Sequence, residues 1–173
     1  MIPFEQLRTL SRYNRWMNER LYERCASLAD AERRRDRGAF FGSIHGTLNH
    51  LLLGDLLWLG RFRGDPYPVT SLDQELHADF EALRAARRQL DGDIERFVEG
   101  LRDADLEAPH VFESVVNRRE HHFPLWFTLT HFFNHQTHHR GQLTTLMSQA
   151  GCDPGVTDLL WLPGAELSDG VRP

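Results

Sequence analysis

The chain has 173 residues, of which 40% are hydrophobic, and this is enough for a single domain, residues 1–173, with a sizeable core. Its formal net charge is −5 and all 20 of its basic residues are Arg, a balance that argues against a nucleic-acid-binding surface. No apolar run approaches the roughly 20 residues that span a bilayer, so we expect no membrane segment.

The first residues carry no apolar signal core, because charged and apolar side chains alternate from Glu5 onward. We therefore expect a cytoplasmic protein. Cys25 and Cys152 are the two cysteines, and they belong to no C-x-x-C pair. This predicts reduced thiols and argues against both a disulfide framework and a cysteine zinc site.

Hydrophobic periodicity predicts two long helices in the first part of the chain. The first runs from about Phe4 to Leu28, with apolar residues at spacings of three, four and seven. A short charged segment follows, and Ser43 can then cap a second helix that continues to about Phe62. The apolar stripe of this second helix contains Leu48, Leu51, Leu52, Leu56, Leu59 and Phe62.

Two further long helices are predicted in the second half. Glycine and prolines in residues 64–68 end the second helix, and a third is expected from near Leu72 to about Leu101. Pro124 suits the first turn of a fourth helix that reaches about Ala150.

Two shorter segments complete the prediction. Residues 103–123 change from Val and Phe to polar residues, which indicates a small irregular hairpin before the last helix. Residues 159–162 read Leu-Leu-Trp-Leu and are too apolar to be left in water, so we expect this tail to pack back on the bundle. The sequence thus predicts an all-α four-helix bundle with a hairpin insertion.

The connection between the second and third helices leaves the topology open. Nine extended residues, 63–71, cover roughly 30 Å at about 3.3 Å each, which is about the length of a 20-residue helix. A crossover that makes these two helices parallel is therefore allowed. An ordinary up-down-up-down bundle is allowed as well.

A histidine cluster is the most informative feature of the sequence. Six of the ten histidines lie between His121 and His139. His135 and His139 are four residues apart, so their imidazoles share one face of the last helix, and Phe132 and Leu146 place that face toward the core. Two imidazoles one turn apart can bind one cation.

His50 is the third nitrogen that we expect to join this pair. It shares a helical face with Gly54, and the missing side chain there would leave room for a metal and its water. The alternative is that His50 is an ordinary hydrogen-bonded core residue. His131 is a weaker candidate ligand, His138 ranks below His139, and His45 is expected to be structural; the surface or loop histidines are predicted to be His77, His110, His121 and His122.

Three polar residues near these histidines are candidates for orienting a ligand or contacting substrate: Asp55, Asn134 and Gln142. Other metalloenzyme classes fit less well. Gln136 stands where the H-E-x-x-H metalloprotease motif has its catalytic Glu. Thr47, Phe132 and Gln136 stand where di-iron bundles have the Glu of Glu-x-x-His pairs, so one metal is favoured over two.

Two segments of the chain resemble the signatures of the DinB-like, or DinB/YfiT, superfamily. These are S-I-H-G-T-L-N-H-L-L-L-G-D-L-L-W-L, which contains His50, and H-F-F-N-H-Q-T-H-H-R-G-Q-L-T-T-L-M, which contains His135 and His139. The resemblance implies an up-down-down-up four-helix bundle, commonly a homodimer, with a divalent metal held by three histidines. Members of this superfamily include thiol-dependent S-transferases and a mycothiol-dependent isomerase.

The leading hypothesis is therefore a mononuclear metal enzyme that acts on a small-molecule substrate. Three imidazoles and an open position suit zinc, nickel, iron or manganese, and the chemistry that the resemblance favours is transfer involving a low-molecular-weight thiol. The competing hypothesis is a non-catalytic stress or structural protein whose metal only pins the second helix to the fourth. No motif identifies a catalytic residue or a substrate.

Overall fold

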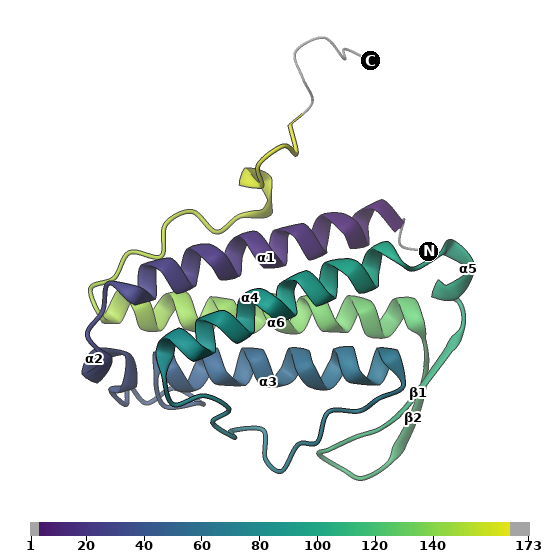
Figure 1. The fold of residues 1–173 in the computed structure, drawn as a ribbon, viewed down its shortest axis with the longest axis horizontal. Coiled ribbons are helices and arrows are strands. Elements are labelled where there is room, and N and C mark those ends of the chain that lie inside the picture. The colour runs from purple at the N-terminus through teal and green to yellow at the C-terminus, as the bar shows by residue number, and fades with distance from the viewer. Residues whose placement is uncertain (1–3, 167–173) are drawn as a thin grey trace.

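The computed structural model describes residues 4–166 and contains four long helices (Figure 1). They are α1 (Phe4–Ala26), α3 (Ile44–Arg63), α4 (Phe80–Glu99) and α6 (Leu125–Gln149). Two short helices, α2 (Asp30–Arg34) and α5 (Asp103–Leu106), lie in the connections, and a 3-10 turn, η1 (Leu159–Trp161), follows α6. Within these residues no helix is long and apolar enough to cross a membrane.

The helix directions follow the up-down-down-up order. In Figure 1, α1 runs from right to left, α3 and α4 both return from left to right, and α6 runs from right to left again. The two middle helices are thus parallel, and the connection between them travels back along the bundle. This confirms the expected four-helix bundle and selects the crossover over the ordinary alternating order.

The predicted second and fourth helices agree with the structure to within a few residues. The Ser43 hydroxyl accepts a hydrogen bond from the Gly46 amide at the start of α3, as expected for an N-cap. The helix ends at Gly64, whose φ of 72° is the left-handed conformation that glycine adopts without strain. The predicted end of the first helix, Leu28, is two residues beyond the observed Ala26, a normal uncertainty for frayed ends.

The predicted start of the third helix was wrong. α4 begins at Phe80, where the Asp79 carboxylate caps the amide of Ala82, and not near Leu72. Residues 64–79 instead form an extended connection along α3. The side-chain oxygen of Asn49 accepts hydrogen bonds from the amides of Leu76 and His77, so tertiary contacts satisfy backbone groups that a helix would otherwise pair.

The core lies between the four long helices and contains one buried charged network. Leu7, Leu48, Leu83 and Leu143 are among its fully buried apolar residues, one from each long helix. Beside them, Arg87 contacts Asp55 at 2.6 Å and Asp91 at 2.9 Å, and both carboxylates are buried; further members of this network are Asn14, Asn18, Gln136 and Arg140. Opposite charges and amides compensate each other here, as burial requires.

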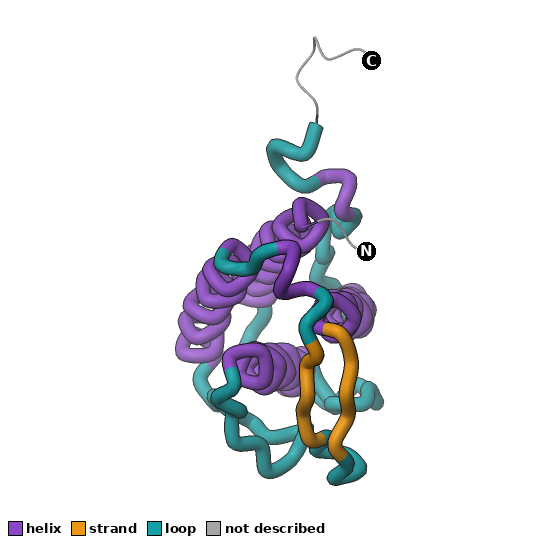
Figure 2. The backbone as a smooth tube through the Cα atoms, turned by 90° about the vertical axis from the view of Figure 1, so that its right-hand side faces the viewer, coloured by secondary structure: helices purple, strands orange, loops and turns teal. Residues whose placement is uncertain are grey.

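The predicted hairpin is present before α6. Strands β1 (Pro109–Glu113) and β2 (Glu120–Pro124) pair antiparallel, and they stand beside the bundle at the end where α6 begins (Figure 2). The register pairs His110 with Phe123 and Phe112 with His121. Because side chains alternate along a strand, these four rings share one face of the hairpin, and their contacts with Trp58 and Phe62 place that face against α3.

The chain after α6 only partly follows the expectation. Leu162 is buried, and the Tyr13 hydroxyl donates a hydrogen bond to the Thr157 carbonyl, so part of this segment packs on α1. Leu160 and Trp161, however, are 77% and 57% exposed. The expectation that this tail packs back on the bundle therefore holds for Leu162 and for the segment around Thr157, whereas η1 leaves Leu159, Leu160 and Trp161 exposed.

Candidate metal centre

Three histidines from two helices meet at one point of the bundle. His50 comes from α3, and His135 and His139 come from successive turns of α6. Each contributes a ring nitrogen, and these nitrogens all lie within 4.8 Å of one another. The Nε2 atom of His139 is 3.1 Å from that of His50 and 3.0 Å from that of His135. Within residues 4–166, no further His, Cys, Asp or Glu joins this group.

Hydrogen bonds on the far side of two rings determine which nitrogen carries a hydrogen. Nδ1 of His50 donates to the carbonyl of Leu72 at 2.8 Å, and Nδ1 of His139 donates to the side-chain oxygen of Gln142 at 2.8 Å. A neutral imidazole carries one hydrogen, so the Nε2 atoms of both rings present lone pairs. Nδ1 of His135 makes no hydrogen bond with the described residues, which leaves its tautomer open.

This arrangement fits a cation. The facing lone pairs on Nε2 of His50 and Nε2 of His139 repel each other at 3.1 Å. A hydrogen on Nε2 of His135 would relieve only the contact between His135 and His139. Two nitrogens that bind one zinc ion at about 2.0–2.1 Å lie roughly 3.0–3.4 Å apart, which agrees with the two separations between His139 and its neighbours His50 and His135. His50, through the Leu72 carbonyl, and His139, through Gln142, also show the outer hydrogen bonding that orients metal-bound imidazoles.

Burial keeps the three imidazoles neutral at neutral pH. Removal from water lowers the pKa of His50 to about 4. Burial, together with the neighbouring rings of His139 and His50, lowers the pKa of His135 to about 3. Burial also lowers the pKa of His139. Neutral imidazole is the form that binds metal, so protons compete weakly for this cluster.

Close packing holds the rings in place. The ring of Phe41 stacks on that of His50, with centroids 3.7 Å apart and planes inclined by 16°. Gly54 has a different role from the one expected, because a Cβ atom there would lie 3.2 Å from Cε1 of His135. The space left by the missing side chain is filled by the His135 ring and not by room for a metal and its water.

One side of the cluster opens into a cavity of about 240 Å³, between α3, the connection after it and the hairpin. The polar and charged groups in its wall are His50, His135, His131, Arg61 and Ser114, and its apolar part includes Leu57, Leu72, Trp58, Phe112 and Val115. None of its lining residues is a carboxylate. A small molecule in this cavity would contact two of the three histidines directly.

The three polar residues that we expected near the site have different positions. Gln142 contacts His139, as described above. Asp55 faces the core, where it accepts hydrogen bonds from Gln136 and Arg87 at 2.6 Å each, so it does not contact the histidines. Asn134 is exposed on α6, and its side chain forms no hydrogen bond within the described part of the chain.

Four of the seven remaining histidines lie in or near the bundle in different settings. His131 lines the cavity, with its ring centroid 5.8 Å from that of His135, and His138 is exposed beside His139. His45 is bound to the His77 carbonyl and has a structural role, as expected. The surface or loop prediction was wrong for His110, which is 8% exposed on β1 and bonds to the Thr128 hydroxyl at 3.0 Å.

Two parts of the site were not anticipated. The Leu72 carbonyl that orients His50 belongs to a segment that we predicted to be helical, where that oxygen would have been used within the helix. Phe41 belongs to the apolar pair Phe40–Phe41, which stands just before the Ser43 cap. This position next to the cap is the one sequence signal that Phe41 could fold over the start of α3. Its contact with His50 depends on a turn that the sequence pattern did not reveal.

Comparison with known proteins supports the same fold and family. The family model described as DinB family matches residues 3–170. Among characterised proteins, the chain is similar to Protein DinB of Bacillus subtilis (strain 168), with 26% identity over 160 residues that cover 86% of this chain and 88% of that protein.

Two solved structures share the fold. A DinB-like protein from Bacillus cereus ATCC 10987 matches with a TM-score of 0.60 and 22% identity, covering 82% of this chain and 91% of that one. YfiT from Bacillus subtilis, described as a probable metal-dependent hydrolase with an unusual four-helix bundle topology, matches with a TM-score of 0.66 and 18% identity over 88% of this chain and 92% of that one. Together with the match of the family model across nearly all of the sequence, these findings show that the chain belongs to the DinB family.

Proposed function

We propose that this protein is a metal-dependent enzyme that activates a low-molecular-weight thiol for transfer to a second small molecule. The observation that carries the proposal is the set of three convergent Nε2 atoms beside an accessible cavity. His50, His135 and His139 would hold one divalent ion, for which zinc, nickel, iron and manganese all suit imidazole ligands. When bound, such an ion would lower the pKa of a thiol or water that it contacts.

The cavity wall favours a thiol over water as the nucleophile. Hydrolysis by a three-ligand metal site commonly uses a carboxylate as general base, yet no Asp or Glu lines this cavity, and Asp55 is committed to the core. A thiol is more acidic than water and needs less help to lose its proton. The chain's own contribution would be to position the nucleophile in a cavity whose wall has no Asp or Glu side chain to compete for the ion.

Arg61 supports an anionic co-substrate. Its guanidinium lines the same cavity, and it is held in place by a 2.9 Å hydrogen bond from Nη2 to the Glu113 carbonyl. Cellular thiols with peptide-like or sugar acid groups carry carboxylates, which a guanidinium binds through charge-assisted hydrogen bonds. Arg61 is therefore the residue that we propose anchors the carboxylate of the thiol.

Hydrolysis is the second candidate, and one observation favours it. His131 lines the cavity near His135, and a neutral imidazole there could accept a proton from water. YfiT, which shares this fold, is described as a probable metal-dependent hydrolase. Under this alternative, His131→Ala would abolish hydrolysis, whereas a thiol transferase would retain metal-dependent thiol consumption and lose only the substrate contacts of this ring.

The deciding experiment begins with protein purified without a histidine tag, whose metal content is measured. The metal-loaded protein is then assayed for consumption of glutathione, bacillithiol and mycothiol in the presence of simple electrophiles. Metal-dependent loss of one thiol supports the proposal. Bound metal with no thiol consumption and no hydrolysis, combined with lower stability after metal removal, would support the alternative in which the ion only pins α3 to α6.

A further inference from the structure

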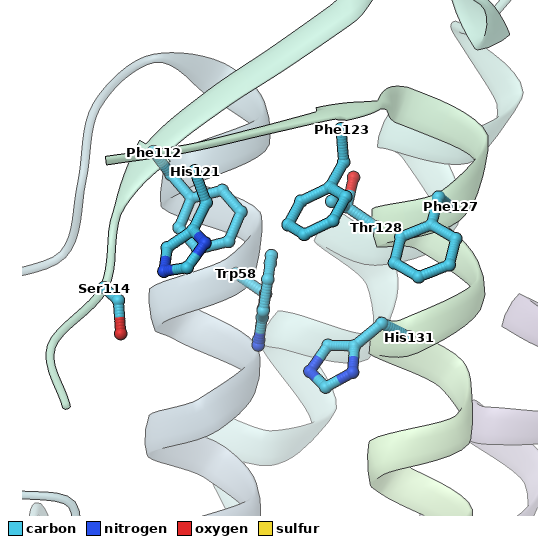
Figure 3. A pocket seen from close by; sticks show the side chains of 8 residues that line it. All are labelled: Trp58, Phe112, Ser114, His121, Phe123, Phe127, Thr128 and His131. Carbon is cyan, nitrogen blue, oxygen red and sulfur yellow. The ribbon is translucent and has the colours of Figure 1, made fainter. Parts of the chain in front are cut away.

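A second cavity of about 260 Å³ adjoins the first and is lined mostly by aromatic rings (Figure 3). Trp58 comes from α3, Phe112 and Ser114 from the first strand and its end, His121 and Phe123 from β2, and Phe127, Thr128 and His131 from α6. Figure 3 shows these side chains around a common space, with the Trp58 indole between the hairpin rings and His131. We call this space the aromatic pocket.

The aromatic pocket adjoins the metal cavity. Trp58, Phe112, Ser114 and His131 line both spaces, so the two share part of their walls. The His131 ring lies 5.0 Å from the Trp58 ring and 5.8 Å from the His135 ring, measured between centroids, so this shared wall reaches one of the three histidines. A group bound in the pocket would place a reacting atom attached to it near the metal centre.

We propose that the aromatic pocket binds an uncharged aromatic group of the electrophilic substrate. An apolar cavity of about 150 Å³ is sufficient to hold benzene, so this pocket can hold a ring with a substituent. Phe123 and Phe127 are nearly parallel at 5.0 Å, and Trp58 and Phe112 meet edge to face at 5.0 Å, so ring faces and edges are both available. Phe127 remains 45% exposed, which leaves an apolar surface that a ligand would cover.

The charges around the pocket exclude the other common occupant of an aromatic cage. Such cages also bind quaternary ammonium groups, usually with a carboxylate nearby. Here no carboxylate lines the pocket, and the Arg61 guanidinium lies over two of its rings, 4.8 Å from the Trp58 centroid and 4.6 Å from the Phe112 centroid. The positive charge of Arg61 repels a cationic ligand from the pocket. The guanidinium itself forms the proposed anion-binding position, which lies outside the pocket.

This inference rests on the proposed thiol transfer for its chemistry. The thiol loses its proton to solvent, and its sulfur forms a bond to the substrate carbon next to the ring. The bond from that carbon to the leaving group breaks at the same time, and the leaving group departs with the electron pair. For benzyl chloride, the products are a benzyl thioether, chloride and a proton.

Binding is tested first, without any reaction. Benzyl alcohol, cyclohexylmethanol and benzyltrimethylammonium are titrated into the zinc-loaded protein, with calorimetry for affinity and amide chemical shifts of Ser114 and Thr128 for location. We expect benzyl alcohol to bind best and to shift both amides. Phe127→Ala should weaken its binding about three- to tenfold, as expected for one aromatic contact. Equal binding of the ammonium probe, no binding at all, or shifts elsewhere would overturn the inference.

The control is Trp161→Ala, which removes an exposed ring from η1, outside both cavities, and should leave benzyl alcohol affinity unchanged. The folded state of both variants is checked by thermal unfolding. In a second assay, thiol transfer to benzyl chloride is compared with transfer to butyl chloride, and Phe127→Ala should lower kcat/KM for the benzyl compound alone. Binding without any transfer would contradict the proposed function but not the pocket, whereas transfer without binding or aromatic preference would contradict the pocket alone.

Discussion

The Nε2 atoms of His50 and His139 face each other at 3.1 Å, and hydrogen bonds on the opposite side of each ring leave both without a hydrogen. The two atoms come from residues 89 positions apart in the sequence. Such a contact is unfavourable in an empty site and favourable around a cation.

The first prediction concerns metal content. His50→Ala, His135→Ala and His139→Ala should each lower bound metal from about one equivalent per chain to a small fraction, because two imidazoles cannot replace three. Elemental analysis of untagged protein measures this. The matched control is His138→Ala, which removes an exposed imidazole next to His139 and should keep full metal content. Full metal content in all three ligand variants would refute the assigned site.

The second prediction concerns Gln142, which accepts the hydrogen bond from Nδ1 of His139. Gln142→Leu should lower zinc affinity about 10-fold or more, as is typical when the outer partner of a metal-bound imidazole is lost. Gln142→Glu retains an acceptor oxygen and should keep the affinity within a few-fold of the native value. Competition with a chromophoric chelator gives both dissociation constants. Similar losses in the two variants would show that hydrogen-bond acceptance is not the relevant property.

The third prediction separates helix stability from metal binding at Gly54. Gly54→Ala adds a Cβ atom 3.2 Å from the His135 ring, so the ring must shift by a few tenths of an ångström. Zinc affinity should fall, while the metal-free protein keeps or gains stability because alanine favours a helix by about 1 kcal/mol over glycine.

Gly92→Ala is the control for this change. A Cβ atom at Gly92 meets only the flexible end of Arg96, at 3.3 Å, so this variant should gain stability with unchanged zinc affinity. Thermal unfolding and chelator competition measure the two quantities independently. If Gly54→Ala behaved like Gly92→Ala in both measurements, the proposed contact with His135 would have no consequence for the metal.

The fourth prediction concerns the buried charge network. Arg87→Met should lower the free energy of unfolding by about 3–5 kcal/mol, because it leaves the carboxylates of Asp55 and Asp91 buried without their cation. Urea unfolding of the metal-free protein measures the loss. The double variant Arg87→Met with Asp91→Asn should recover part of it. A loss below 1 kcal/mol for the single variant would show that solvent reaches this network.

The fifth prediction is a pH dependence of the metal-free protein. The pKa of His50 is lowered from an ordinary value near 6.5 to about 4, so the unfolded chain binds more protons than the native state between these values. The contribution of His50 to the free energy of unfolding is complete above about pH 6.5 and is lost as the pH falls toward 4. His50→Gln should therefore show a shallower decline in unfolding free energy over this range. Urea titrations at several pH values with chelator present give the difference, and parallel curves would contradict the assignment.

The sequence predicted the helices and the histidine cluster because both depend on local spacing. Imidazoles four residues apart on one helix share a face whatever the rest of the fold does, and the two motifs linked that face to His50. The start of α4 was mispredicted because residues 72–79 have apolar spacing that also suits a helix. Their conformation is decided by the Asn49 side chain from another part of the chain.

Other features depend on pairings that no single segment encodes. The aromatic pocket exists because the hairpin register places Phe112 and Phe123 on the same face and because that face meets Trp58. Likewise, Asp55 was a reasonable candidate for the site from its nearness to His50 in sequence. Helical spacing already turns Asp55 away from His50, because five residues advance an α-helix by about 500°. Its contact with Arg87, however, follows from how α3 and α4 pack.

The parallel arrangement of α3 and α4 has a consequence for the connection between them. A chain that leaves one end of α3 and starts α4 at the other must travel the full length of the bundle, and in doing so it passes His50 and provides the Leu72 carbonyl. The return path and the orientation of the His50 ring are thereby coupled. Insertions or deletions in residues 64–79 would turn this ring without replacing any of the three clustered histidines.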